Sequence, residues 1–188
     1  MQQTDTNAFK VVGQRLSGAE WLLSPFSSPR PPWADIELVV IHCISLPEGV
    51  YGTGYPAQLL LGQLDTGSHP SFADLADLEV SSHFLVDRLG RVQQFVELDR
   101  QAWHAGASEW RGRTSCNRFS IGIEVEGCDS DGYTEAQYES VARMLRALLD
   151  HYPGLSGDQI VGHQEVAPGR KKDPGPGFDW AGLFRRLA

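Results

Sequence analysis

This sequence of 188 residues has few cysteines, no long apolar run and no excess of positive charge. Its three cysteines, Cys43, Cys116 and Cys128, form an odd set without CxxC spacing, which predicts reduced thiols and no disulfide framework. No run is long enough to span a bilayer, and the start, MQQTDTNAFKVVGQRL, lacks the apolar core of a signal peptide. We therefore expect a cytoplasmic protein.

Positive charge is in the minority, with 16 lysines and arginines against 24 aspartates and glutamates and a net charge of −8. Nucleic acids and anionic membrane surfaces bind basic patches, so neither is an expected partner. The length predicts one domain with a substantial core, and no repeat or linker divides the chain.

Apolar runs separated by turn signals predict several strands. Residues 37–44 (ELVVIHCI) are a continuous β-branched run, typical of a strand buried on both faces. Residues 119–127 (FSIGIEVEG) predict another strand, and residues 159–163 a short one. Residues 80–99 predict a β-hairpin with Gly90 in its turn.

Helix signals occur between and after these strands. Thr134 and Gln137 make a capping box at the start of a helix with one apolar stripe, which Pro153 ends. Pro56 suits the first turn of a shorter helix, and Asp179 could cap a terminal one.

The remaining segments are expected to be irregular. These are residues 1–35, which are rich in proline toward their end, and residues 162–180, which hold too much proline and glycine for a helix. The order of elements predicts a single α/β domain with a mixed central β-sheet flanked by helices.

A metal site is one interpretation of three titratable residues. His42 lies in an apolar strand, where an imidazole is either a hydrogen-bonded core residue or a ligand. With His163 and Asp173 it would make a three-ligand zinc set with a fourth position open for water. Spacing alone is weak support, because no HExxH helix is present.

Two acids could serve such a site. Glu124 and Glu126 lie two apart on a predicted strand and so project from the same face. One of them could be a general base for a zinc-activated water, or both could be solvated acids at a strand end. Strand parity does not choose between these alternatives.

Other polar residues have weaker signals. Lys171 could stabilise an oxyanion, although lysines in loops are usually only solvated. Cys43 follows His42 on the strand and should point to the opposite face, which argues against a Cys/His pair. Trp103 and His104 could line a sugar or peptide site, and His83 is expected to be structural.

Five ordered sequence blocks resemble one known family over a region from about Trp21 to the C-terminus. The blocks are HCISLP, SSHFLVDRLGRVQQFVELDRQAWHAG, CNRFSIGIEVEG, YTEAQY and GHQEVAPGRKKDPGPGFDW. They resemble the zinc-dependent N-acetylmuramoyl-L-alanine amidases, which share a fold with peptidoglycan recognition proteins and phage T7 lysozyme. The resemblance implies an amidase domain over residues 21–188, preceded by an extension of residues 1–20.

The resemblance also assigns roles. It implies one zinc per chain, bound by His42, His163 and Asp173, with Glu124 and not Glu126 as the catalytic acid. Lys171 matches the family's catalytic lysine. The five matched positions of this chain are His42, Glu124, His163, Lys171 and Asp173.

The implied reaction is hydrolysis of the amide between the muramic acid lactyl group and L-alanine. Similarity is greatest to the cytoplasmic members that recycle cell wall, which implies small 1,6-anhydro-N-acetylmuramyl peptides as substrates. We expect the protein to be a monomer. One alternative is an amidase that attacks polymeric peptidoglycan. Another is a non-catalytic peptidoglycan-binding module, although such relatives lose a ligand or the catalytic acid and this chain keeps all five positions.

The chain also departs from its relatives. It has Cys43 where they usually have asparagine, and Glu79 and Ser115 where they have arginines that receive substrate carboxylates. Cys43 and Arg113 are therefore added to the expected substrate contacts, because Arg113 could replace an arginine missing at 115. We expect weaker discrimination for an acidic third residue of the stem peptide.

Overall fold

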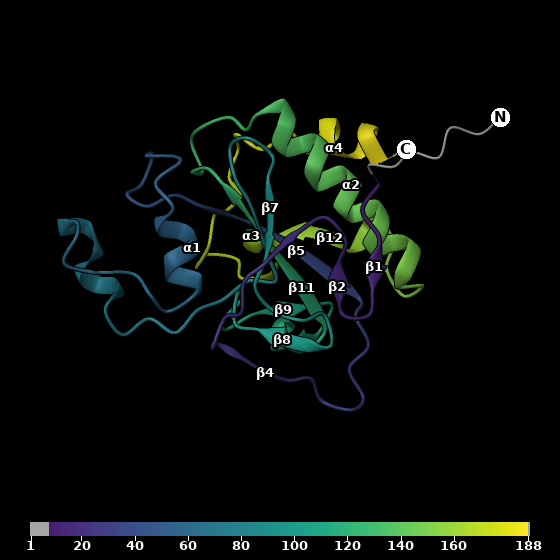
Figure 1. The fold of residues 1–188 in the computed structure, drawn as a ribbon. Coiled ribbons are helices and arrows are strands. Elements are labelled where there is room, and N and C mark those ends of the chain that lie inside the picture. The colour runs from purple at the N-terminus through teal and green to yellow at the C-terminus, as the bar shows by residue number, and fades with distance from the viewer. Residues whose placement is uncertain (1–7, 188) are drawn as a thin grey trace.

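The computed structural model describes residues 8–187, and a six-stranded mixed β-sheet lies at its centre (Figure 1). In spatial order the strands are β12 (Ile160–Gly162), β5 (Leu38–Ile44), β11 (Ser120–Glu126), β6 (Phe84–Val86), β7 (Val92–Gln94) and β3 (Glu20–Trp21). The first four run parallel, and β7 is antiparallel to β6. The predicted α/β fold with a mixed sheet is confirmed.

A long helix, α2 (Glu135–His151), covers one face of the sheet, with α4 (Trp180–Leu187) packed beside it (Figure 1). Alternation along the strands places Ile41 and Ile123 in the core beneath α2. Both hydrogen bonds of the predicted capping box are present, and α2 ends just before Pro153.

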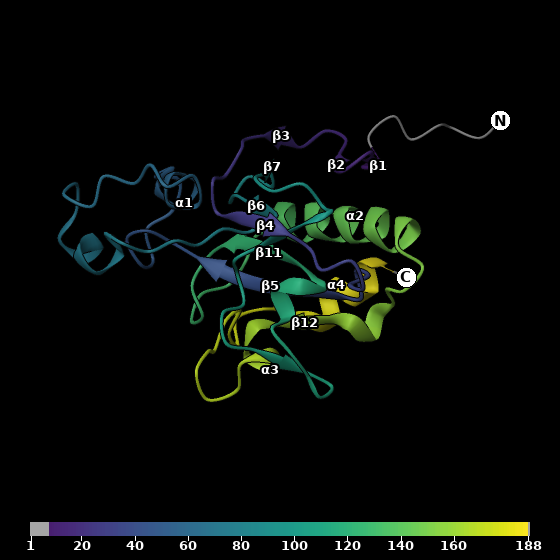
Figure 2. The same ribbon diagram turned by 90° about the horizontal axis from the view of Figure 1, so that it is seen from below.

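The opposite face of the sheet is covered by short elements and loops (Figure 2). Leu38 and Val40 pack there against Phe119 and Val166. The elements on this side are β8 (Arg100–Ala102), β9 (Glu109–Trp110), β10 (Arg113–Thr114), η2 (Cys116–Arg118) and α3 (His163–Val166). Because none of the described residues forms a long helix over this face, strand side chains near its edge can line a cavity.

The segment that holds α1 (Tyr55–Leu60) and η1 (Pro70–Leu75) stands to one side of the sheet in both views (Figures 1 and 2). Pro56 lies in the first turn of α1, as predicted. The β6–β7 hairpin is also confirmed, and its turn residue Gly90 has a positive φ of 76°. A β-carbon at Gly90 would lie 2.5 Å from the Ala136 carbonyl oxygen, so the turn can approach α2 only with glycine.

Two expectations of irregular structure are wrong. Residues 8–35 contain β1 (Val11–Val12), β2 (Arg15–Leu16), β3 and β4 (Ser27–Pro29), which pair with each other or with later strands. Short pairings of this kind depend on distant partners, which local composition does not reveal. The segment 162–180 begins with the single helical turn α3, because its prolines come only after residue 167.

Part of the predicted extension lies against the domain. Leu16 is buried in the main core, and Phe9 packs against that core. Residues 1–7, which include much of the start used to exclude a signal peptide, lie outside the described residues. The domain boundary at residue 21 stays a prediction. Within residues 8–187, none of the helices combines the length and hydropathy needed to cross a membrane.

Candidate metal centre and its cavity

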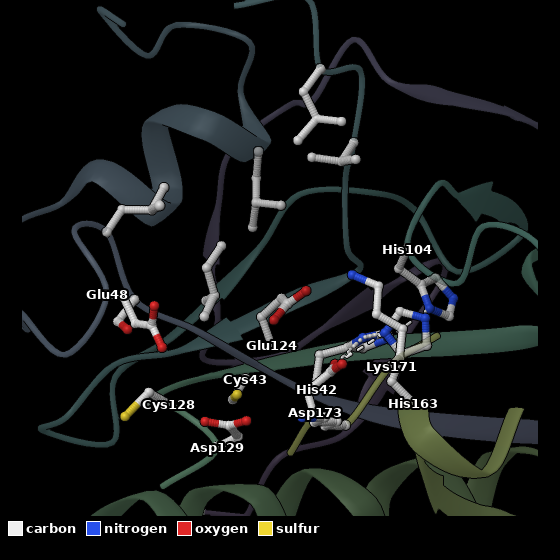
Figure 3. A pocket seen from close by; sticks show the side chains of 18 of the residues that line it. His42, Cys43, Glu48, His104, Glu124, Cys128, Asp129, His163, Lys171 and Asp173 are labelled. Atoms are coloured by element: carbon white, nitrogen blue, oxygen red, sulfur yellow. Dashed lines mark hydrogen bonds and ion pairs between the residues drawn. The ribbon is translucent and has the colours of Figure 1, made fainter. Parts of the chain in front are cut away.

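The predicted metal ligands and Glu124 lie together at the carboxyl ends of the parallel strands (Figure 3). His42 near the end of β5 lies in register with Glu124 of β11, so both side chains project from the same face. His163 follows β12 directly. Ligands of open α/β sheets bind at this edge, because the side chains of neighbouring strands converge there.

His42, His163 and Asp173 form a compact set of possible metal ligands. The two histidine Nδ1 atoms are 2.9 Å apart, and Asp173 Oδ2 lies 3.1 Å from His42 Nδ1 and 3.0 Å from His163 Nδ1. Asp173 is held by its backbone, whose carbonyl accepts from the Gln164 amide at 3.1 Å. The loop rich in proline and glycine thus places the Asp173 carboxylate beside the end of β12.

The protonation of this set suits a cation. His163 Nε2 lies 3.1 Å from the Ala105 carbonyl oxygen, which can only accept, so the proton is on Nε2 and a lone pair is on Nδ1. That lone pair points at another ring nitrogen and at a carboxylate oxygen. Two imidazoles and one carboxylate are a usual ligand set for zinc. The residues present therefore fit a zinc ion.

The pKa values of His42 and Asp173 agree with this assignment. Burial lowers the pKa of His42 to about 4, against a smaller opposing effect of the neighbouring Asp173, so the ring is neutral at pH 7. Burial of Asp173 favours its neutral acid form, but the two adjacent histidine rings outweigh burial and hold its pKa below the usual value. Neutral imidazole and carboxylate are the forms that bind metals.

The two glutamates of β11 have different surroundings. Glu126 Oε1 accepts from the Gly52 amide at 2.6 Å, and its Oε2 accepts from the Arg88 amide at 3.1 Å. Glu124 Oε2 is buried and has no hydrogen-bond partner among the described residues. Burial, and then the charge of Asp173, raises the pKa of Glu124 to about 8, although Lys171 opposes the shift. Only Glu124 has a carboxylate oxygen left to bind a proton or a ligand.

A cavity of about 660 Å³ opens over these residues. Lys171 extends into it beside the histidines (Figure 3). Another part of its wall is apolar and comes from the side segment with α1 and η1 and from the loop after it, through Leu60, Leu75, Leu78 and Val80. The cavity therefore joins a charged floor to an apolar wall, as sites for amphiphilic small molecules do.

The predicted substrate contacts divide into two groups. Trp103, His104 and Cys43 line the cavity. Arg113 does not: its guanidinium pairs with Glu37 at 2.6 Å and lies over the Phe119 ring. The guanidinium of Arg113 is therefore engaged outside the cavity, so Arg113 is not a proposed substrate contact.

The remaining positions of the specificity hypothesis also lie apart from the site. Glu79 is exposed, and neither Glu79 nor Ser115 is among the residues that line the main cavity. Burial raises the pKa of the Cys43 thiol to about 12, so this thiol stays protonated and is a poor nucleophile.

Sequence reasoning missed the side chains that support the site from behind. Arg170 Nη2 donates to the carbonyls of Ala105 at 2.6 Å and Ala107 at 2.7 Å. Asn117 Oδ1 accepts from the amides of His104 and Ala105. These partners are backbone groups, which leave no signature in a sequence.

The comparisons with known proteins identify the class. The N-acetylmuramoyl-L-alanine amidase family matches residues 32–176, which is most of the chain. The chain belongs to this family.

Among its relatives is the 1,6-anhydro-N-acetylmuramyl-L-alanine amidase AmpD of Escherichia coli, which is 48% identical over 172 residues, or 92% of this chain and 93% of that protein. A crystal structure of a selenomethionine derivative of AmpD has a TM-score of 0.91 at 43% identity, covering 95% of this chain and 99% of that one. A complex of the Escherichia coli amidase AmiD with anhydro-N-acetylmuramic acid-L-Ala-D-γ-Glu-L-Lys matches with a TM-score of 0.64 at 29% identity, covering 84% of this chain and 60% of that one.

Proposed function

We propose that the protein is a zinc amidase that cleaves the bond between the lactyl group of muramic acid and L-alanine in soluble 1,6-anhydro-N-acetylmuramyl peptides. The observation that carries this proposal is the meeting, in one cavity, of three convergent metal-binding atoms and the unpartnered Oε2 of Glu124. Family membership supports the reaction class.

His42, His163 and Asp173 would hold the zinc ion, one per chain. Zinc in such a set polarises a carbonyl group and makes water acidic enough to lose a proton near neutral pH. The protein's own contribution is to fix the three donors within about one hydrogen-bond length of each other and to keep the His42 ring neutral.

Glu124 would act as general base and then as general acid. Its free, buried oxygen can take the proton of the attacking water and deliver it to the amide nitrogen that leaves as the amine of L-alanine. Lys171 extends from the loop before Asp173 into the same cavity, where its ammonium group can stabilise the negative charge that develops on the scissile carbonyl oxygen.

The substrate class rests on the relatives and on the shape of the cavity. AmpD is named for an anhydromuramyl substrate, and AmiD has been crystallised with an anhydromuramyl tripeptide. The cavity, bounded on one side by α1, η1 and the loop that follows η1, has the size of a small-molecule site. Both points favour a soluble muropeptide over polymeric peptidoglycan.

The test gives equal concentrations of anhydromuramyl tripeptide and of intact peptidoglycan to the purified protein and measures released peptide. We expect rapid release from the soluble substrate, loss of activity in chelator and recovery on adding about one equivalent of zinc. The Glu124→Gln variant serves as the zinc-binding but inactive control. Faster release from intact peptidoglycan would favour the lysin-like alternative, and full activity in chelator would refute the metal mechanism.

We also propose that the protein is cytoplasmic and that it is a monomer. All three cysteines are free thiols, as a reducing compartment maintains them. Fractionation of cells against a periplasmic marker tests the location, and light scattering of the purified protein tests the oligomeric state.

A further inference from the structure

Residues 103–105 lie directly behind the two histidines of the metal-binding set. We propose that this segment holds both histidines in their metal-binding tautomers, with His104 as the positioning residue for His42. The inference rests on the proposed function, because it presupposes a metal at the set. His104, which the sequence predicts as a substrate contact, is here assigned the support of the metal ligand His42.

Hydrogen-bond directions assign the proton of the His104 ring. Ser120 Oγ donates its only proton to the Cys116 carbonyl at 2.7 Å, so it must accept from His104 Nε2 at 3.0 Å. The His104 ring therefore carries its proton on Nε2 and a lone pair on Nδ1. His42 Nε2 lies 2.9 Å from His104 Nδ1 and donates to its lone pair, which leaves His42 Nδ1 unprotonated and free to bind a metal.

The next residue does the same for the second histidine. The Ala105 carbonyl accepts from His163 Nε2 at 3.1 Å, so His163 Nδ1 is also unprotonated. The same carbonyl accepts from Arg170 Nη2 at 2.6 Å, and its two lone pairs can serve both donors. Two consecutive residues of one loop thus determine the tautomers of two ligands that are far apart in the sequence.

The segment is fixed in place from several sides. Asn117 Oδ1 accepts from the amides of His104 at 3.2 Å and Ala105 at 2.8 Å, and Ser81 Oγ accepts from the Trp103 amide at 2.9 Å. The His104 ring lies against the backbone of β11 at Gly122, where a β-carbon would be only 2.5 Å from its Cγ atom. The ring fills a slot that exists because this position is glycine.

Such an arrangement has a definite consequence for metal binding. An acceptor on the far nitrogen of a ligating histidine holds the ring in its tautomer and orientation and makes it a better ligand. Removal of the acceptor typically weakens metal binding ~10- to 100-fold. His104 should therefore contribute to zinc affinity, and its loss should lower kcat more than it raises KM.

The test compares two variants of similar size and shape. His104→Asn keeps an acceptor oxygen close to the position of the imidazole Nδ1, whereas His104→Leu replaces it with a methyl group. Zinc affinity is measured by competition with a chromophoric chelator, and the visible spectrum of the cobalt-loaded protein reports ligand geometry. We expect His104→Leu to bind zinc ~10- to 100-fold more weakly than the parent protein, and His104→Asn to recover most of that loss.

A buried neighbour provides the control. His83 is fully buried beside His104, with ring centroids 6.0 Å apart, and it bonds to the Gly122 amide and the Arg100 carbonyl, not to a ligand. His83→Leu should lower the unfolding free energy of the metal-free protein, measured in excess chelator, without a comparable loss of zinc affinity. If His104→Leu does not fold, Asn117→Ala and Asn117→Asp are compared in place of the two His104 variants. Aspartate can still accept the hydrogen bonds from the His104 and Ala105 amides, and alanine cannot.

The outcomes separate this inference from the proposed function. Zinc binding by His104→Leu within about threefold of the parent protein would overturn the inference, as would equal weakening in the leucine and asparagine variants. Both results leave the zinc amidase proposal intact. Failure of the parent protein to bind zinc with one-to-one stoichiometry would overturn the proposed function itself.

Discussion

At the scale of the residue, Glu124 and Glu126 share a strand and a face but differ in the partners of their carboxylates. Glu126 is satisfied by two backbone amides and ties the loop at Gly52 to the hairpin turn at Arg88. Glu124 has a buried oxygen without a partner among the described residues. An unpaired buried polar atom is costly, and such costs are usually retained for function.

This difference predicts opposite phenotypes for two identical substitutions. Glu124→Gln should keep its zinc and its stability but lose ~100- to 10,000-fold in kcat, because an amide cannot accept the proton. Glu126→Gln should keep kcat within a few-fold and lose ~1–3 kcal/mol of unfolding free energy, since an amide satisfies only one of its two donors. Turnover, zinc content and urea unfolding are measured for both, and exchanged phenotypes would contradict the assignment of the base.

At the scale of the element, β11 organises the site along its length. On the face opposite α2 its residues are Ser120, Gly122, Glu124 and Glu126. Ser120 bonds to His104, Gly122 leaves room for that ring, Glu124 is the proposed base, and Glu126 bonds to two loops. The residues between them point into the core under α2. One strand of alternating side chains thus serves the core and the active site together.

The slot at Gly122 gives a prediction for this element. Gly122→Ala should displace the His104 ring, because its β-carbon would lie 2.5 Å from the ring. We expect weaker zinc binding and a changed cobalt spectrum, with β11 still paired on both sides. Gly157→Ala is the control, since nothing lies within 4 Å of a β-carbon there. Unchanged zinc affinity in Gly122→Ala would contradict the close packing of the His104 ring on Gly122.

At the scale of the whole molecule, the candidate metal centre and the fold are linked through protonation. In the metal-free protein, burial lowers the pKa of His42 to about 4 and raises that of Glu124 to about 8. Stability should fall as pH drops from about 6.5 toward 4, because the unfolded chain protonates its histidine first. It should also fall as pH rises from about 4.5 to 8, because the unfolded chain ionises its glutamate first.

Glu124→Gln should remove the decline on the alkaline side. The measurement is the unfolding free energy from urea titrations in excess chelator between pH 5 and 9, where we expect the parent protein to lose on the order of a few kcal/mol. The groups that act on Glu124 are Asp173, which raises its pKa, and Lys171, which lowers it. Glu139→Gln, at an exposed position on α2, should behave like the parent protein. An equal decline in Glu124→Gln would contradict the raised pKa.

Local patterns in the sequence determined the main elements and their order. The capping box of α2, the apolar runs of β5 and β11 and the glycine turn of the β6–β7 hairpin act over a few residues, so they can be recognised without the fold. The ligand set and the base came from the resemblance of five ordered blocks. The structure brings those three ligands to within hydrogen-bond distance of each other and leaves Glu124 free.

Only the tertiary structure decided which polar groups are already engaged. Arg113 is paired with Glu37, 76 residues away, and the ring of His104 is wedged between His42 and Ser120. The sequence around each residue does not reveal these contacts, because the partners are far apart in the chain and meet only in the folded structure. Sequence patterns identify residues that can do chemistry, whereas hydrogen bonds between distant segments determine which of them remain free to do it.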